Sequence, residues 1–174
     1  GDKVRSSHEL QAFIERGHEV HLLAFADDLN DLNYRVDLGR MCATVGIVPL
    51  RRVWAVARAL VNLAFLRSLS RGYFASRKMR RMVKRAVSDN DFDAVFVCSS
   101  PMAQYVPREL APRAVVDMAD VDSEKCPDRA VGANPLRSWV CSLECKRLRE
   151  YEYKVIAGFA NTVVNSPSSG GTQA

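Results

Sequence analysis

Polar side chains that could take part in chemistry follow two apolar runs of this 174-residue chain. The run Ala94 to Cys98 is too short for a helix and ends at Ser99 and Ser100. The run Ala114 to Val116 leads directly into the acidic stretch Asp117 to Ser123. Such runs are typical of strands buried on both faces of a parallel sheet. Because ligands of open α/β sheets bind beyond the carboxyl ends of strands, we expect the two strand exits to lie side by side and form the floor of a site.

The same side chains are equally suited to a purely structural role. Asp120, Asp122 and Ser123 are residue types that cap helix N-termini, and serine and proline are common wherever a strand turns into a helix. Residue type alone does not separate the two roles, so both remain open at each position.

The elements that position these residues alternate between helix and strand. A helical repeat ends at Gly17, which suits the C′ position of a helix. The repeat of Met79, Met82, Val83 and Ala86 predicts an amphipathic helix over 76–87. The expected helices are 4–16, the end of 27–41, 53–66, 76–87 and 135–159, and the expected strands are 18–25, 43–49, 94–98, 114–116 and 161–165. This alternation predicts a three-layer α/β sandwich with a parallel sheet.

The charge is unevenly distributed along the chain. The net charge is +5, yet no acidic residue occurs between Asp37 and Asp89, an interval that holds twelve arginines and lysines. Such a distribution indicates an interacting surface or a solvated basic face, and it says nothing of the fold.

The composition, 48% hydrophobic and 26% charged, fits one globular domain, which we place at 1–167, followed by a disordered Ser/Gly tail at 168–174. The apolar run 53–66 is interrupted by Arg58 and is shorter than the ~20 residues that span a bilayer. The five cysteines have neither metal-site nor disulfide spacing, and their use is typical of a reducing compartment. Cys98 is expected to act as a small hydrophobe in a buried strand.

Several segments together resemble one enzyme family. They are GDKVRS at 1–6, HEVHL at 18–22, FDAV at 92–95, SSPM at 99–102 and DVDSEK at 120–125. In this order they are similar to the family-4-type glycosyltransferases of the GT-B fold, specifically the sugar transferases of bacterial exopolysaccharide and PEP-CTERM systems. The resemblance is collinear from Gly1 to about Asn165, and DVDSEK and SSPM are its more specific strings.

The resemblance implies a two-domain enzyme that transfers a sugar from a nucleotide-sugar donor to a lipid-linked or polysaccharide acceptor, without a metal or other cofactor. This chain would be the Rossmann-like N-terminal half, which binds the acceptor. The donor would bind mainly to a C-terminal half outside this sequence. Because the chain opens on a helix that follows a Gly-Asp-Lys turn, we expect that a first strand precedes Gly1. Without that strand and the donor-binding half, the fragment alone is expected to be inactive.

The resemblance identifies few residues of this chain as counterparts of the family's functional residues. Where many relatives have a His-Asp pair, this chain has Ala119-Asp120, which leaves Asp120 as the candidate catalytic base and Asp122 as the second candidate. Near the end, the Val-Ser-Glu usual in relatives is replaced by Val164-Asn165-Ser166-Pro167. The residues expected to line the acceptor cleft are Gly1, Asp2, Lys3, Arg5, His8, Ser99, Ser100 and Lys125. The remaining histidines, His18 and His21, are expected to be surface or hydrogen-bonded core groups.

The resemblance also implies a peripheral position at the inner, cytoplasmic face of a bacterial membrane. The basic residues expected to face anionic lipid, with Trp54 beside them, are Arg51, Arg52, Arg58, Arg77, Lys78, Arg81 and Lys84. Phe65, Tyr73 and Phe74 are further interfacial candidates. The alternative is a non-enzymatic basic module that binds nucleic acid, although the sequence contains no pattern of a known nucleic-acid-binding motif. A lone α/β nucleotide-binding or regulatory domain is a third possibility.

Overall fold

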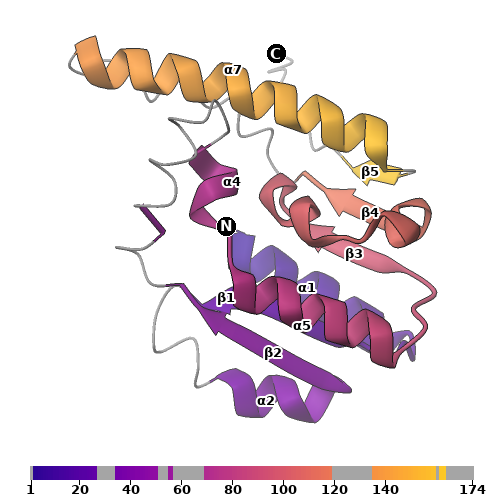
Figure 1. Ribbon diagram of the computed structural model, residues 1–174. Helices are drawn as coiled ribbons and strands as arrows, with labels where there is room; N and C mark the ends of the chain where they lie inside the picture. The colour runs from indigo at the N-terminus through magenta and orange to yellow at the C-terminus, as the bar shows by residue number, and fades with distance from the viewer. Residues whose placement is uncertain are drawn as a thin grey trace, which may run out of the picture. The chain divides into compact units, whose positions relative to one another are not determined.

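The computed structural model describes residues 2–26, 34–50, 55–56, 69–118, 135–159 and 161–163, without the side chains of 2–4 and 135–141. These residues form an α/β structure with two small, open, parallel sheets (Figure 1). The chain divides into two compact units. Unit 1 is Gly1–Asp93 with Tyr105–Pro107, and unit 2 is Ala94–Gln104 with Arg108–Ala174. The prediction of α/β alternation with parallel strands is confirmed, whereas a single domain over 1–167 stays a prediction.

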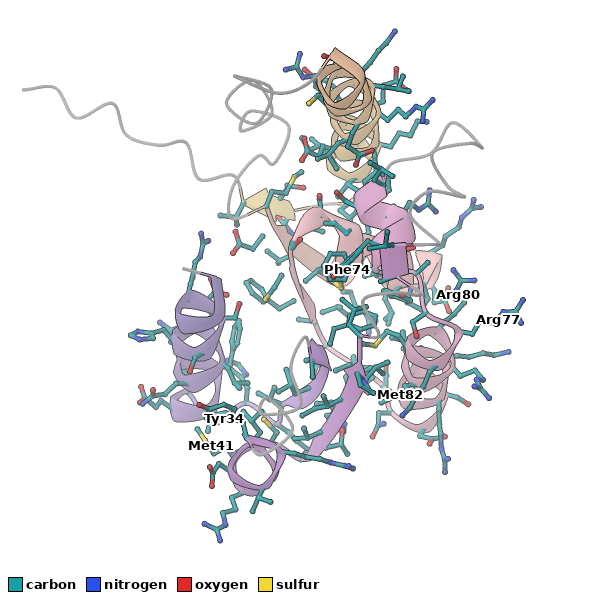
Figure 2. All side chains as sticks on the ribbon, turned by 90° about the vertical axis from the view of Figure 1, so that its left-hand side faces the viewer. Tyr34, Met41, Phe74, Arg77, Arg80 and Met82 are labelled. Atoms are coloured by element: carbon teal, nitrogen blue, oxygen red, sulfur yellow. The ribbon has the colours of Figure 1, made fainter. Side chains whose placement is uncertain are left out.

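Unit 1 is built on the parallel pair β1 (His21–Ala26) and β2 (Thr44–Pro49), which align His21 with Thr44 and Ala26 with Pro49. Helices α1 (Asp2–Glu15) and α5 (Arg77–Asp89) lie on opposite faces of this sheet (Figures 1 and 2). The short helices α2 (Tyr34–Met41) and α4 (Leu69–Tyr73) complete the described part of the unit. The expected helix 53–66 lies outside the described residues, apart from two helical positions, 55 and 56.

Helix α1 ends as the sequence predicts. Gly17 has a left-handed φ of 82°, its N–H donates to the carbonyl of Ile14, and the N–H of His18 donates to the carbonyl of Phe13. These two bonds form a Schellman motif, and the edge-on contact of the Phe13 and His18 rings supplies its usual side-chain contact. The helix begins earlier than expected, at Asp2, so the predicted Gly-Asp-Lys turn is wrong at Asp2 and Lys3.

Helix α5 is the amphipathic helix expected from the methionine repeat. Ser76 caps its N-terminus, since the Ser76 hydroxyl accepts a hydrogen bond of 3.2 Å from the N–H of Met79. Met79 is buried, and Met82 reaches Gly46 on β2, where a Cβ atom would overlap its methyl group. A glycine at this position therefore lets the helix pack closely on the sheet.

Unit 2 contains the three-stranded parallel sheet β3 (Val95–Cys98), β4 (Ala114–Asp117) and β5 (Asn161–Val163), with β4 in the centre. Two short 3-10 helices, η2 (Ser100–Tyr105) and η3 (Arg108–Arg113), lead from β3 to β4. The last helix, α7 (Pro135–Gly158), precedes β5. Ala114 and Val116 on β4 are fully buried, which fits a central strand.

Two expectations for unit 2 are wrong. Strand β3 is not buried on both faces: Val97 is buried, but Phe96 and Cys98, which alternate with it, are exposed. Because successive strand residues point to opposite faces, only one face of β3 is covered among the described residues, and Cys98 is no core residue. For α7, the helical repeat predicts that Leu148, Val155 and Ile156 share the apolar side. Leu148 and Val155 are buried, but Ile156 is exposed, and the charged residues Arg147 and Glu152 are buried.

Candidate functional site at the ends of strands β3 and β4

The two polar strand exits lie next to each other, as the sequence predicts. Strands β3 and β4 are parallel neighbours, and Cys98, the last residue of β3, is aligned with Asp117, the last residue of β4. Directly beyond this pair, the N–H of Ser99 donates a hydrogen bond of 2.8 Å to the carbonyl of Asp117. The carboxyl ends of the two strands therefore form one edge that carries Ser99, Ser100 and Asp117, the place where open parallel sheets bind ligands.

Ser99 makes the turn out of β3 with an unusual backbone. Its φ is 79°, in the left-handed region that residues with a side chain rarely adopt. The carbonyl of Ser99 accepts a hydrogen bond of 3.1 Å from the N–H of Met102, which starts η2 directly after the strand. Residues held in this region concentrate at active sites and ligand clamps, because the surrounding structure must hold them there. The strained turn sets Ser99 apart from an ordinary helix cap.

We expect the variant Ser99→Gly to be more stable than the parent by up to ~1 kcal/mol, because glycine adopts a positive φ without steric cost. Ser100→Gly is the matched control: Ser100 is buried, its φ is not positive, and its replacement by glycine should lower stability by about the same amount. Urea unfolding of the three proteins measures both effects. A destabilised Ser99→Gly variant would show that the serine side chain, and not backbone strain, dominates at this turn.

Asp117 is a functional candidate that is not among the site residues predicted from the sequence. It is the last residue of β4 and only 3% exposed, although it is a carboxylate. Buried carboxylates are uncommon unless they are paired, and they are enriched at functional sites. The signal in the sequence is an acidic residue directly after an apolar strand, whereas the family resemblance favours the more distal Asp120 and Asp122.

The remaining cleft residues are distributed differently. Asp120, Asp122, Lys125 and Gly1 lie outside the described residues, and the side chains of Asp2 and Lys3 are not described either. Arg5 and His8 lie on α1, in unit 1, whereas Ser99 and Ser100 lie in unit 2. Arg5 is held by an ion pair of 3.0 Å with Glu9 one helical turn away, and His8 is exposed. Among the described side chains, Ser99 and Ser100 are the predicted cleft residues that lie together within one unit, at the end of β3.

His21 has the local role expected of it. Its Nδ1 lies 3.0 Å from the hydroxyl of Thr44 on β2, its Nε2 lies 3.3 Å from a carboxylate oxygen of Glu19, and its ring meets Phe92 edge-on. These contacts tie the beginning of β1 to β2, at the end of the strands opposite to the one where ligands of parallel sheets bind. We assign His21 a structural role.

The cysteines differ from one another. Cys42 is buried, and burial raises the pKa of its thiol, so Cys42 behaves as a core residue. Cys98 is exposed and forms no disulfide, whereas Cys145 is disulfide-bonded to a partner outside the described side chains. The cysteine spacing did not predict this bond. Among the described residues, no group of three or more His, Cys, Asp or Glu side chains is placed to hold a metal ion.

The basic residues predicted to face lipid are only partly described. Arg51, Arg52, Trp54, Arg58 and Phe65 lie outside the described residues, whereas Arg77, Lys78, Arg81 and Lys84 are exposed on α5. The assignment of Tyr73 and Phe74 as interfacial groups stays a prediction. Both are partly buried in an aromatic cluster in which Phe74 contacts Phe25 and Tyr73, because the chain folds back over the end of β1.

Within the described residues, no helix combines the length and the apolar character needed to cross a bilayer. Comparison of the chain with protein-family models, with curated proteins and with solved structures finds no match.

Proposed function

We propose that this chain is the acceptor-side, Rossmann-like half of a family-4-type glycosyltransferase of the GT-B fold. The enzyme transfers a sugar from a nucleotide sugar to a lipid-linked or polysaccharide acceptor in bacterial exopolysaccharide synthesis, at the cytoplasmic side of the membrane. The observation that carries the proposal is the shared edge of β3 and β4, where Ser99, Ser100 and Asp117 follow two adjacent parallel strands. The collinear sequence resemblance supplies the reaction, and the parallel strands are the arrangement that this fold requires.

The chemistry that we assign to this edge is general base catalysis. In the transfer, the acceptor oxygen bonds to the anomeric carbon of the sugar while the bond from that carbon to the nucleotide phosphate breaks, and the nucleotide leaves with the electron pair. The acceptor hydroxyl must lose its proton in this step, and a carboxylate within hydrogen-bond reach can accept it. In this proposal Asp120, three residues after the end of β4, is the base, and Asp122 is the second candidate. Ser99 and Ser100 would hold the acceptor hydroxyls. The nucleotide sugar would bind mainly to the other half of the enzyme, and no metal or other cofactor is part of the proposal.

A second candidate function has an observation in its favour. Six exposed arginines and lysines on α5 fit a non-enzymatic basic α/β module that binds a polyanion. This module would need neither Asp120 nor a second domain, so the two functions differ in what the complete coding region must contain.

The test uses the product of the complete coding region around Gly1 and Ala174, incubated with radiolabelled UDP-, GDP- and dTDP-sugars and a bacterial lipid extract. We expect label in the lipid or polysaccharide fraction, and slower transfer by the Asp120→Asn variant with unchanged folding. Asp122→Asn, two residues away, is the matched comparison and should transfer faster than Asp120→Asn. A product without a second α/β domain, or one that transfers none of these sugars, would contradict the proposal and leave the binding module.

A further inference from the structure

The outward side of α5 carries a dense group of positive charges. Arg77 and Arg80 point away from the strands in Figure 2, and the six exposed basic residues of the helix occupy one arc of roughly 160° at 100° per residue. We call this arc the basic face of α5. Its members are Arg77, Lys78, Arg80, Arg81, Lys84 and Arg85.

Few of these charges are paired with an acidic side chain among the residues that the structure describes. Within the described chain, Arg85 is the one member of the basic face that forms an ion pair, with Asp89 at 3.4 Å. Both side chains of this pair are well exposed. The sequence offers no acidic residue from Leu38 to Ser88. Concentrated like charges repel one another, and a positive potential of this kind favours a negatively charged partner. The electrostatic complement of the basic face is therefore an external surface with several negative charges.

The opposite side of α5 is occupied. Met79 is 3% exposed, and Met82 points toward β2, where it contacts Gly46 (Figure 2). Interfacial amphipathic helices bind a bilayer by burying their apolar side in it. Because the apolar side of α5 packs on its own sheet, the helix has no apolar side to insert, and only its charges are available to a partner.

We propose that the basic face of α5 binds an anionic lipid surface by charge alone, without insertion. Four to eight arginines and lysines on an amphipathic helix are typical of binding to anionic lipid. Nucleic acid fits less well, because the basic face has no aromatic ring on which bases could stack and the sequence contains no pattern of a known nucleic-acid-binding motif. The inference deepens the proposed function, since it names the surface where a lipid-linked acceptor would be met, but its test involves no sugar transfer.

The test is sedimentation of the full chain with vesicles of phosphatidylcholine alone or mixed with phosphatidylglycerol. We expect binding only to the mixed vesicles, and release by salt, since the screening length falls to about 3 Å at 1 M salt. The double variant Arg81→Gln/Lys84→Gln removes two central charges and should weaken the partition coefficient ~30-fold, which corresponds to about 1 kcal/mol for each charge. Both side chains are exposed, so circular dichroism should show an unchanged fold.

The matched control is Arg35→Gln/Arg40→Gln on α2, which removes the same net charge from exposed positions of the same unit. We expect the control to weaken binding less than threefold. Equal losses in the two double variants would overturn the proposal, because binding would then follow net charge and not the basic face.

Two further outcomes would also overturn it. A rise in surface pressure when the protein meets a phosphatidylglycerol monolayer would show insertion. Binding to a random-sequence DNA duplex that outcompetes the mixed vesicles at equal phosphate concentration would assign the basic face to nucleic acid. Neither outcome bears on sugar transfer, so the glycosyltransferase proposal would stand or fall separately.

Discussion

Replacement of Met79 by alanine is expected to lower the free energy of unfolding by about 2–5 kcal/mol, the range for truncation of a buried methionine. Met79 is 3% exposed and lies in the centre of the apolar side of α5. Its removal takes away the contacts of the side chain and leaves a cavity between the helix and the sheet, which the neighbouring Met82 fills only in part. Urea unfolding followed by circular dichroism measures the loss.

The control is Arg80→Ala, the next residue of the same helix, whose side chain points to solvent (Figure 2). Alanine and arginine have similar helix propensities, so this change should alter stability by less than ~0.5 kcal/mol. Similar effects at the two positions would contradict the packing of α5 on the sheet. Because the proposed lipid contact requires that the apolar side of α5 stay on the sheet, the same pair of variants also tests that premise.

Helix α5 was predictable because every local signal agrees. Ser76 is a good N-cap, Met79 and Met82 follow the helical repeat, and basic residues fill the other side. The end of α1 was predictable for a similar reason, since Gly17 adopts the left-handed conformation that a Schellman motif requires. Both cases depend on residues within one or two turns of each other, which is the range over which a sequence pattern carries its information directly.

The errors concern burial, which depends on residues far away in the sequence. The run Ala94 to Cys98 is apolar throughout, so its sequence does not reveal that Phe96 and Cys98 face outward. In α7, Arg147 and Glu152 are buried although charged residues are usually found at the surface. The helical repeat of apolar residues predicts which side of a helix is apolar. Which elements cover that side depends on the tertiary structure.

The candidate site was predictable in its position and less so in its residues. Strand exits at 98–99 and 117–118 follow from the apolar runs, and their adjacency follows from the parallel pairing of consecutive strands. The left-handed backbone of Ser99 was not predictable, because serine has no preference for it. The burial of Asp117 depends on β5, which pairs with β4 from more than forty residues away in the sequence.

Tyr105, in the aromatic cluster of unit 1, forms two hydrogen bonds through its hydroxyl. After the truncation of Met79, their loss should cause the largest decrease in the free energy of unfolding. The hydroxyl of Tyr105 donates to the carbonyl of Phe74 and accepts a hydrogen bond of 2.8 Å from the N–H of Ser76. One side chain thus satisfies two backbone groups in the segment that enters α5. No sequence pattern indicates this bridge, which spans 29 residues between Ser76 and Tyr105.

We expect Tyr105→Phe to lower the free energy of unfolding by about 2–3 kcal/mol. The ring contact with Phe25 is kept, but the Phe74 carbonyl and the Ser76 N–H each lose a partner in a partly buried place, at a cost of roughly 1–3 kcal/mol per group before water compensates. Amide exchange at Ser76 and Met79 should accelerate as well, because Ser76 caps the helix that follows.

Tyr73→Phe is the matched control for this bridge. Tyr73 belongs to the same aromatic cluster, its ring meets that of Phe74 edge-on at 5.1 Å, and its hydroxyl has no hydrogen-bond partner among the described residues. The same loss of one oxygen atom should therefore change stability by less than ~0.5 kcal/mol. Equal effects of the two substitutions would show that the hydroxyl of Tyr105 is not the group that fixes the entry to α5, and that ring packing alone holds the basic helix in place.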